Sequence, residues 1–495
     1  MGNHRPFLRT LARVTRRRDL LLACLLGILA LTWSAFAAVR VTQVSLQDEW
    51  TYIDYAYKAA HFHIPAPGEQ IGAFTQHEWD CRGTGQAPNI SAGCPDGRAT
   101  THLELPFEGE NYNTFHPPLL LAAAGFTGRL WAALGGSFVV GARFFSGIVA
   151  AAGVILIYYA LRRFRLSTPA CFGGALTVLA TPAIANAAAI VHTDSINILA
   201  GALALWFLGR VTRGNSGWVA PALATLAITY CRVQAVVPML AVAAMLACAA
   251  LRPRLFPVGG DIGGGNEAAN GGGAGSDNAP GAGGTRAETG RSTAVRATGI
   301  RGAYWRIVAG QIGAVLLGYG SWSQIQAWRA PAGYVASIQG VSTNPLADHG
   351  AWGVLRTFID IPLNGPYGLT QPGADYHMAP QMLWVGTNVW GWMLFAVYMA
   401  VFLGCVMAVI RTVATRISTG TVLAGLVLTT AVVQGREVLL HHMYFRRISG
   451  RYAVVTAPQH ALVLAAWLDH HGWAWTLPVF GAIGYVLVFL GPLVG

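Results

Sequence analysis

Two carboxylates, Asp48 and Glu49, follow the first apolar stretch of the chain and open a long polar segment that ends at His116-Pro117-Pro118. A carboxylate at a membrane surface can accept the proton of an acceptor hydroxyl while the second substrate is drawn from the lipid. We therefore expect Asp48 to act as a general base, with Glu49 as its reserve or as a group that orients the acceptor. The alternative is that both residues form a solvated cap at a helix end.

The composition indicates an all-α polytopic membrane protein. Hydrophobic residues make up 54% of the 495 positions and charged residues only 11%, whereas a soluble domain carries about 25% charged residues. The net charge of +12 would suit a nucleic-acid partner, but the arginines lie at the ends of apolar spans, where the positive-inside rule places them. The charge is therefore a sign of topology, and we expect no nucleic acid as a partner.

Alternating spans predict the topology of the chain. A basic stretch at 1–19 precedes an apolar run at about 20–39, which we predict to be a retained signal anchor with its amino end in the cytoplasm. An extracytoplasmic loop at 40–117 and an interfacial helix at 118–135 follow, and about 11 transmembrane helices are expected in all. The later spans are predicted near 139–160, 170–190, 195–210, 217–231, 234–251, 306–327, 384–410, 418–434, 452–468 and 473–493. This is the pattern of a multi-pass protein of the plasma (inner) membrane.

A glycine-rich stretch at 257–302 interrupts this pattern. It is too polar and too rich in glycine to bury a core, so we predict a disordered cytoplasmic linker. The linker divides a transmembrane catalytic module at 20–256 from a second transmembrane module at 303–495, which carries an external loop with interfacial helices at 328–383. No strand precedes the glycines and no Gly-Lys-Ser/Thr follows them, which excludes a nucleotide-binding loop.

Several polar residues at the predicted outer turns could bind substrate. They are His116, Asp194, Arg232, Arg447, Arg451 and Tyr452. Arginines on the outer side break the positive-inside rule, and an anionic phosphate at the interface would account for them. The alternatives are that these arginines contact lipid headgroups or loop carboxylates, and that Asp194 is a plain turn residue.

Two of the seven cysteines, Cys81 and Cys94, lie in the first external loop. We predict a disulfide between them, because the compartment is oxidising and no second cysteine pair is present to complete a metal site. The histidines lack zinc-ligand spacing, so no metal site is predicted. A divalent metal ion that helps to hold a phosphate stays open as a cofactor, and it would leave the reaction class unchanged.

The order of four short motifs resembles the GT-C superfamily of polyprenyl-phosphate-sugar-dependent glycosyltransferases. The motifs are Asp48-Glu49, His116-Pro117-Pro118, His192-Thr193-Asp194-Ser195 and Ser449-Gly450-Arg451-Tyr452, and the resemblance covers about residues 50–470. It is nearest to actinobacterial-type GT-C-like integral membrane proteins, including the DUF2142-like group. The chain departs from these proteins at His192-Thr193-Asp194, where many have Asn before Asp, and in its glycine-rich insertion.

The resemblance implies a GT-C-like bundle and a glycosyltransferase with an extracytoplasmic active site. In such enzymes a carboxylate of the first loop activates an acceptor hydroxyl, which attacks the sugar of a polyprenyl-phosphate donor with inversion. The acceptor would be a cell-envelope glycan, lipid or protein, and the surroundings membrane lipid. On this reading Arg447 and Arg451 stabilise the leaving phosphate with Tyr452 as a hydrogen-bond donor, while His116 binds the phosphate or positions the interfacial helix.

Two functions of another class stay open. A lipid or polysaccharide transporter would place ionisable residues near the bilayer midplane and would show two related halves, whereas here the ionisable residues gather at the outer interface. A non-catalytic envelope-assembly protein would keep the topology but would tolerate the loss of Asp48.

Overall fold

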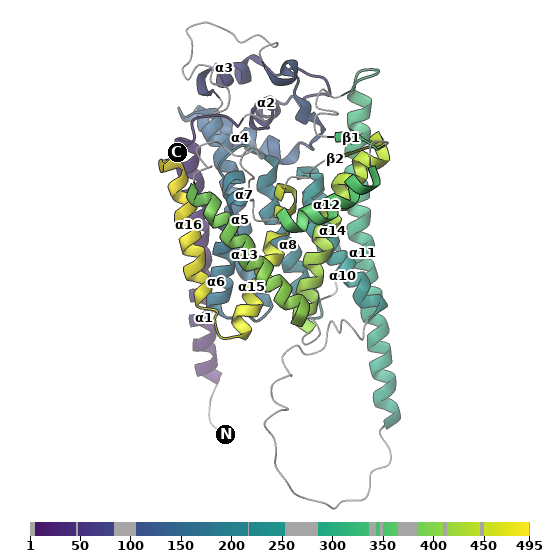
Figure 1. Cartoon of the computed structure of the whole chain (residues 1–495). Helices are drawn as coiled ribbons and strands as arrows, with labels where there is room; N and C mark the ends of the chain where they lie inside the picture. Colours follow the sequence, from purple (N-terminus) through teal and green to yellow (C-terminus); the bar gives the residue numbers. More distant parts are fainter. Residues whose placement is uncertain are drawn as a thin grey trace, which may run out of the picture.

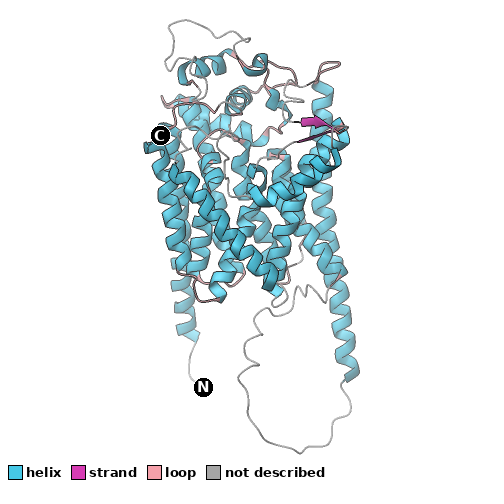
Figure 2. Ribbon diagram, viewed as in Figure 1, coloured by secondary structure: helices cyan, strands magenta, loops and turns pink. Residues whose placement is uncertain are grey.

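The structure, a computed structural model, describes residues 5–45, 48–83, 105–215, 217–252, 286–335, 343–346, 350–364, 385–408, 413–445 and 450–494. Within these residues the chain is almost entirely helical (Figures 1 and 2). The helices of the first half are α1 (Arg5–Arg40), α2 (Glu49–Ala60), α3 (Ala73–Arg82), α4 (Leu119–Ala133), α5 (Phe138–Arg163), α6 (Thr168–Leu179), α7 (Pro182–Ala187), α8 (Ile196–Val211), α9 (Val219–Cys231) and α10 (Val237–Leu251). Those of the second half are α11 (Arg286–Arg329), α12 (Gly350–Asn364), α13 (Val385–Ala408), α14 (Val413–His441), α15 (Ala457–His470) and α16 (Thr476–Val494).

Seven helical stretches of the described residues are long and apolar enough to cross a membrane, so the chain is a multi-span membrane protein. They are Arg16–Arg40, Phe138–Arg163, Thr193–Val211, Val233–Leu251, Val385–Gly404, Arg416–Leu439 and Thr476–Leu493. This is fewer than the eleven that the sequence predicts. Three of the predicted spans are helices of 12, 13 and 14 residues, namely α6, α9 and α15. At a rise of about 1.5 Å per residue these cover roughly 20 Å, less than the apolar core of a bilayer of about 30 Å.

Small residues let the long helices of the first half pack closely. A Cβ atom added to Gly147 of α5 would lie 2.1 Å from Ser34 Oγ of α1, and one added to Gly153 would meet Ile198 of α8 at 2.9 Å. Trp33 of α1 donates its indole N–H to the carbonyl of Ala185 at 2.9 Å, which ties α1 to the α7 segment. Close packing around small residues is the usual source of helix association in membranes.

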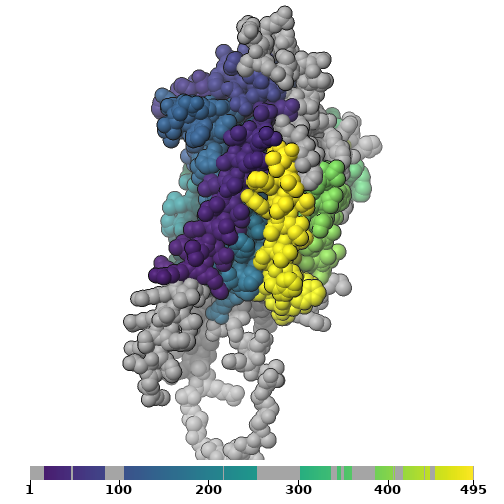
Figure 3. All heavy atoms as spheres, turned by 90° about the vertical axis from the view of Figure 1, so that its left-hand side faces the viewer, coloured from purple at the N-terminus to yellow at the C-terminus, as the bar shows by residue number. Residues whose placement is uncertain are grey.

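The last helix, α16, returns to the first. Phe489 of α16 stacks on Phe36 of α1 with a centroid separation of 4.5 Å, and Tyr485 donates to the carbonyl of Leu29. Figure 3 shows the two helices side by side along one face of the bundle. The bundle is therefore held together at its edge by the two ends of the described chain.

The segment between α1 and α5 gathers at one end of the bundle, which we call the loop end (Figure 1). It contains α2, α3, α4 and two 3-10 helices, η2 (Pro106–Gly109) and η3 (Tyr112–Phe115). The predicted interfacial helix is α4, and it lies so close to α2 that a Cβ atom on Gly125 would fall 2.0 Å from the carbonyl oxygen of Ala56. Gly125 is therefore required for the two helices to meet.

The second half adds one element that sequence patterns did not indicate, a short antiparallel pair of strands. β1 (Thr343–Pro345) pairs with β2 (Met443–Phe445), with Asn344 opposite Tyr444 (Figure 2). The pair joins the second predicted loop to the end of α14. Residues 257–285 of the predicted linker lie outside the described residues. From Arg286 onward the chain is helical in α11, so the last part of the predicted linker is a helix.

Candidate active site

Asp48 immediately precedes α2 and is buried at the loop end. Its side chain makes no capping hydrogen bond to α2. Instead, Oδ1 accepts hydrogen bonds from the hydroxyl of Tyr112 and from Nδ2 of Asn113, each at 3.3 Å. Its other oxygen, Oδ2, lies 3.5 Å from Nε2 of His192. Asp48 is thus held inside a polar cluster and differs from the solvated helix cap that was the alternative.

Glu49 lies beside Asp48 in sequence but has a separate set of partners. Its side chain is fully buried and forms an ion pair with Arg143 of α5, at 2.7 Å from Nε to Oε1 and 2.9 Å from Nη2 to Oε2. The backbone N–H groups of Ser45 and Val191 donate to the same carboxylate. Arg143 also donates to the carbonyl of Gln43 at 2.8 Å. Both oxygens of Glu49 therefore hold the end of α1 and the α7–α8 connection against α5.

His192 connects Asp48 with the turn that opens α8. This turn contains the 3-10 helix η4 (Thr193–Ser195), and the backbone N–H of Asp194 donates to Nδ1 of His192 at 2.9 Å. Because Nδ1 accepts that bond, the ring proton is assigned to Nε2, which faces Asp48 Oδ2. The edge of the ring packs against Tyr52, with the centroids 4.9 Å apart. His192 thus positions Asp48 with a donor on its Oδ2 side.

Arg232 supplies the positive charge of the cluster. It follows α9 in an extended conformation, with 3-10 helix η5 (Val233–Val236) beyond it, and it is 2% exposed. Its guanidinium pairs with the carboxylate of Asp194, and Nη1 donates to Thr193 Oγ1 at 2.9 Å. Nε is buried without a hydrogen-bond partner. A buried arginine with a donor left over is suited to bind a further anionic group.

His116 and Tyr52 complete the cluster on the side of η3. Tyr52 Oη lies 3.1 Å from Nε2 of His116, and the hydroxyl of Thr193 donates to the same oxygen at 3.2 Å. Burial, and secondarily the positive charge of Arg232, hold the pKa of His116 well below its usual value of 6.5. His116 is therefore neutral at physiological pH and can donate or accept a hydrogen bond.

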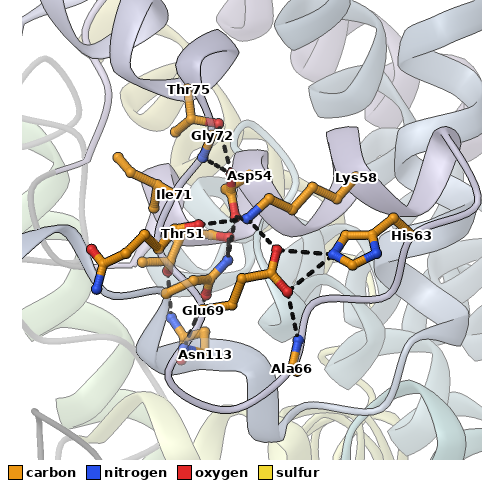
Figure 4. A network of polar contacts seen from close by, with 12 residues as sticks. Thr51, Asp54, Lys58, His63, Ala66, Glu69, Ile71, Gly72, Thr75 and Asn113 are labelled. Atoms are coloured by element: carbon orange, nitrogen blue, oxygen red, sulfur yellow. Dashed lines mark hydrogen bonds and ion pairs between the residues drawn. The ribbon is translucent and has the colours of Figure 1, made fainter. Parts of the chain in front are cut away.

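A second polar network surrounds Asp54 of α2 (Figure 4) and reaches Asp48 through Asn113. Asp54 accepts hydrogen bonds from the backbone of Gly72 at 2.7 Å and from Nδ2 of Asn111 at 2.8 Å. Asn111 in turn accepts the N–H of Asn113. Asn113 then reaches Asp48 and also donates to Thr51 Oγ1 at 2.7 Å. The position of η3 beside Asp48 is thus fixed by a buried carboxylate two turns further along α2.

Lys58 links this network to the turn after α2. Its Nζ lies 2.9 Å from Asp54 and 2.8 Å from Glu69. Burial opposes the ionisation of Glu69, but hydrogen bonds from Lys58, the backbone of Ala66 and His63 outweigh it and lower the pKa of this carboxyl. Both carboxylates of this network thus lie within 2.9 Å of the Lys58 ammonium, which accounts for their placement.

The remaining predicted site residues are placed less completely. The ring of Tyr452 lies 5.9 Å from the guanidinium carbon of Arg232, within reach of a cation–π contact. Arg451 belongs to the 3-10 helix η7 (Gly450–Thr456), but its side chain lies outside the described set, as does the whole of Arg447. Cys81, on α3, is disulfide-bonded, and its predicted partner Cys94 lies outside the described residues.

The structure thus brings together Asp48, His116, Asp194, Arg232 and Tyr452 from five separate segments. The sequence reasoning missed Arg143, although an arginine inside a predicted span was a signal that could have been followed. It also did not assign Tyr52 to the site. No group of three or more His, Cys, Asp or Glu side chains in the described ranges is arranged to hold a metal ion.

No protein-family model and no curated protein matches the sequence. One similar solved structure is the archaeal oligosaccharyltransferase AglB from Archaeoglobus fulgidus in complex with an inhibitory peptide and a dolichol-phosphate, with 11% identity, a TM-score of 0.43, and coverage of 97% of this chain and 56% of that chain. Another is an Archaeoglobus fulgidus oligosaccharyltransferase in complex with zinc and sulfate, with 11% identity, a TM-score of 0.38, and coverage of 94% and 53%.

The chain therefore spans a little over half the length of these two proteins. Similarity at this level identifies neither a substrate nor a reaction. The expected closeness to the DUF2142-like group stays a prediction.

Proposed function

We propose that this chain is an integral membrane glycosyltransferase that moves a sugar from a polyprenyl-phosphate donor to a hydroxyl acceptor of the cell envelope. The loop end would face the extracytoplasmic side, as the arginine distribution predicts. Asp48 would be the general base and Arg232 the principal ligand of the donor phosphate.

One observation carries this proposal: a carboxylate and a guanidinium lie in one cluster at the loop end, connected through two residues. Asp48 contacts His192, His192 accepts the backbone N–H of Asp194, and the carboxylate of Asp194 pairs with Arg232. A transfer from a lipid phosphate needs these two groups close together but not in contact. The base must face the acceptor hydroxyl, and the cation must face the phosphate that leaves.

The chemistry would proceed as a single displacement. Asp48 Oδ2 takes the proton of the acceptor hydroxyl while the oxygen of that hydroxyl attacks the anomeric carbon of the donor sugar. The bond from that carbon to the phosphate oxygen breaks, its electron pair stays on the phosphate, and the configuration is inverted. One carboxylate is enough for this reaction, since no covalent sugar intermediate is formed.

The neighbouring residues then receive distinct roles. Arg232 would stabilise the charge that grows on the phosphate, and its unpaired Nε is the donor available for it. Neutral His116 would bind a donor or acceptor oxygen. Glu49, whose two oxygens are both engaged by Arg143 and backbone N–H groups, would position Asp48. Arg447, Arg451 and Tyr452 stay proposed ligands of the phosphate.

The test is a transfer assay with the purified full chain in liposomes. A panel of labelled polyprenyl-phosphate sugars serves as donors and an envelope extract as acceptor. We expect one donor to be consumed with formation of a labelled product of inverted configuration, and Asp48→Asn to abolish it. Failure of every donor with the wild-type protein would overturn the proposal. Movement of an intact lipid-linked sugar across the liposome membrane without cleavage would instead identify a transporter.

A further inference from the structure

A cluster of arginines lies at the end of the bundle opposite the candidate active site. Helices α5 and α8 both run from the loop end to this opposite end, where α5 finishes at Arg163 and α8 contributes Arg210. Arg213 follows α8 directly and donates from Nε to the carbonyl of Arg163 at 2.8 Å. Three guanidinium groups therefore come from two adjacent helix ends.

The side chain of Arg163 is held in a defined place. Its guanidinium carbon lies 3.5 Å from the centre of the Trp206 ring, a stacked cation–π arrangement that fixes the plane of the group. Its backbone approaches α8 closely, because Gly209 has no side chain and a Cβ there would fall 3.0 Å from Cβ of Arg163. The Nε of Arg163 is buried without a hydrogen-bond partner.

The charges of this cluster are not neutralised within the described part of the chain. Neither Arg163 nor Arg210 has an ion pair there, and the bonds of Arg213 go to backbone carbonyls. The nearby carboxylate of Asp19 is taken by Arg162 and by the hydroxyl of Tyr158. Capping of the last carbonyls of α5 explains the position of Arg213 but leaves Arg163 and Arg210 without a carboxylate partner among the described residues.

We propose that Arg163, Arg210 and Arg213 form a binding site for the phosphate group of an anionic phospholipid. The site lies where two apolar spans end, and the phosphate would accept hydrogen bonds from the arginines. Arginine suits this role because its planar group can contact two phosphate oxygens at once while stacked on an aromatic ring. The inference is independent of the proposed transfer reaction.

Native mass spectrometry of the full chain released from nanodiscs tests the site. The nanodiscs contain equal amounts of phosphatidylglycerol and phosphatidylcholine. We expect the wild-type protein to retain one phosphatidylglycerol, and Arg163→Gln with Arg210→Gln to weaken that retention about 25-fold, at about fivefold for each arginine near a membrane surface. Trp206→Leu, which keeps every charge, should weaken it about threefold by releasing Arg163.

Arg252→Gln is the matched control for the loss of either arginine alone, because Arg252 is exposed just after α10 at the same end of the bundle and its replacement also removes one positive charge. We expect this variant to retain the lipid as the wild type does. A loss of about fivefold in Arg252→Gln, the loss expected for each arginine of the site, would overturn the site in favour of diffuse surface charge. If millimolar inorganic phosphate displaced the lipid, the site would be one for free phosphate, and the proposal that it binds a phospholipid would be wrong.

Discussion

The carboxylates of Asp48 and Glu49 are adjacent in sequence but bind different partners on different elements. Glu49 is fully buried against Arg143 of α5, whereas Asp48 faces His192 and the side chains of η3. One residue thus fixes the backbone and the other presents an oxygen to the cluster. On the proposed function Asp48 is the base and Glu49 its support, so the two residues should respond differently to substitution.

Replacement of Asp48 by Asn should lower the rate of sugar transfer by at least about 100-fold, because the amide cannot accept the proton of the acceptor. The protein should still fold, since the change conserves volume. The measurement is initial transfer rate in liposomes together with thermal unfolding. Glu108→Gln, an equal change of charge at an exposed residue of the same loop, should stay within about twofold of the wild type; a similar loss there would argue against Asp48 as the base.

Replacement of Arg143 by Met should destabilise the fold by about 3–5 kcal/mol, because the buried carboxylate of Glu49 would lose its partner. Glu49→Gln should be costly for the reciprocal reason. The double variant Glu49→Gln/Arg143→Met should cost less than the sum of the two single changes, since no isolated charge is left. Denaturant unfolding of the three variants provides the measurement, and strictly additive losses would contradict the ion pair.

Replacement of Arg232 by Gln should raise the KM for the lipid-phosphate donor by about 10- to 100-fold, because a charge-assisted bond to phosphate is lost. Arg232→Lys should recover only part of this, since an ammonium lacks the planar pair of donors. The informative readout is the separation of KM from kcat for donor and acceptor. A rise confined to the KM of the acceptor would assign Arg232 to the other substrate.

The neutral state of His116 predicts how stability depends on pH. Burial and the charge of Arg232 hold its pKa in the folded protein well below 6.5, whereas the unfolded chain takes up a proton near 6.5. The contribution of His116 to the free energy of unfolding is therefore complete above pH 6.5. It is lost as the pH falls from 6.5 toward the lower pKa of the folded state, by up to about 1.4 kcal/mol per pH unit.

Chemical denaturation at pH values from 7.5 to 5 checks this. His116→Gln should show a shallower loss of stability over that range than the wild type. If the free energy of unfolding fell equally steeply with pH in both proteins, groups other than His116 would cause the pH dependence.

The sequence was sufficient for the class of the fold and for most members of the cluster. Apolar spans and arginine placement follow from the bilayer itself, so helices such as α5 and α8 could be predicted. The contact of Asp48 with His192 could only be suggested by motif order, because 3-10 turns such as η4 leave no periodic signal. The pairing of Arg143 with Glu49 depends on how two helices rotate against each other, which the residue pattern does not specify.

The same reasoning explains why the described residues contain seven long apolar helical stretches where eleven spans were predicted. Hydropathy detects apolar stretches but not where they break, and Pro182 separates α6 from α7 inside one such stretch. The span predicted at 217–231 ends where α9 does, because Arg232 interrupts the helix, but its 13 residues are fewer than a bilayer span needs. That interruption is what places the guanidinium in the cluster.

The ion pair between Glu49 and Arg143 also sets an order for biogenesis. Its two members are 94 positions apart, so when the ribosome has delivered the first loop, the partner of Glu49 has not yet been made. An unpaired carboxylate resists burial, which keeps the start of α2 in water at that stage. Burial of Glu49 therefore requires α5 to be in place, so we expect the loop end to reach its final packing only after that helix is present.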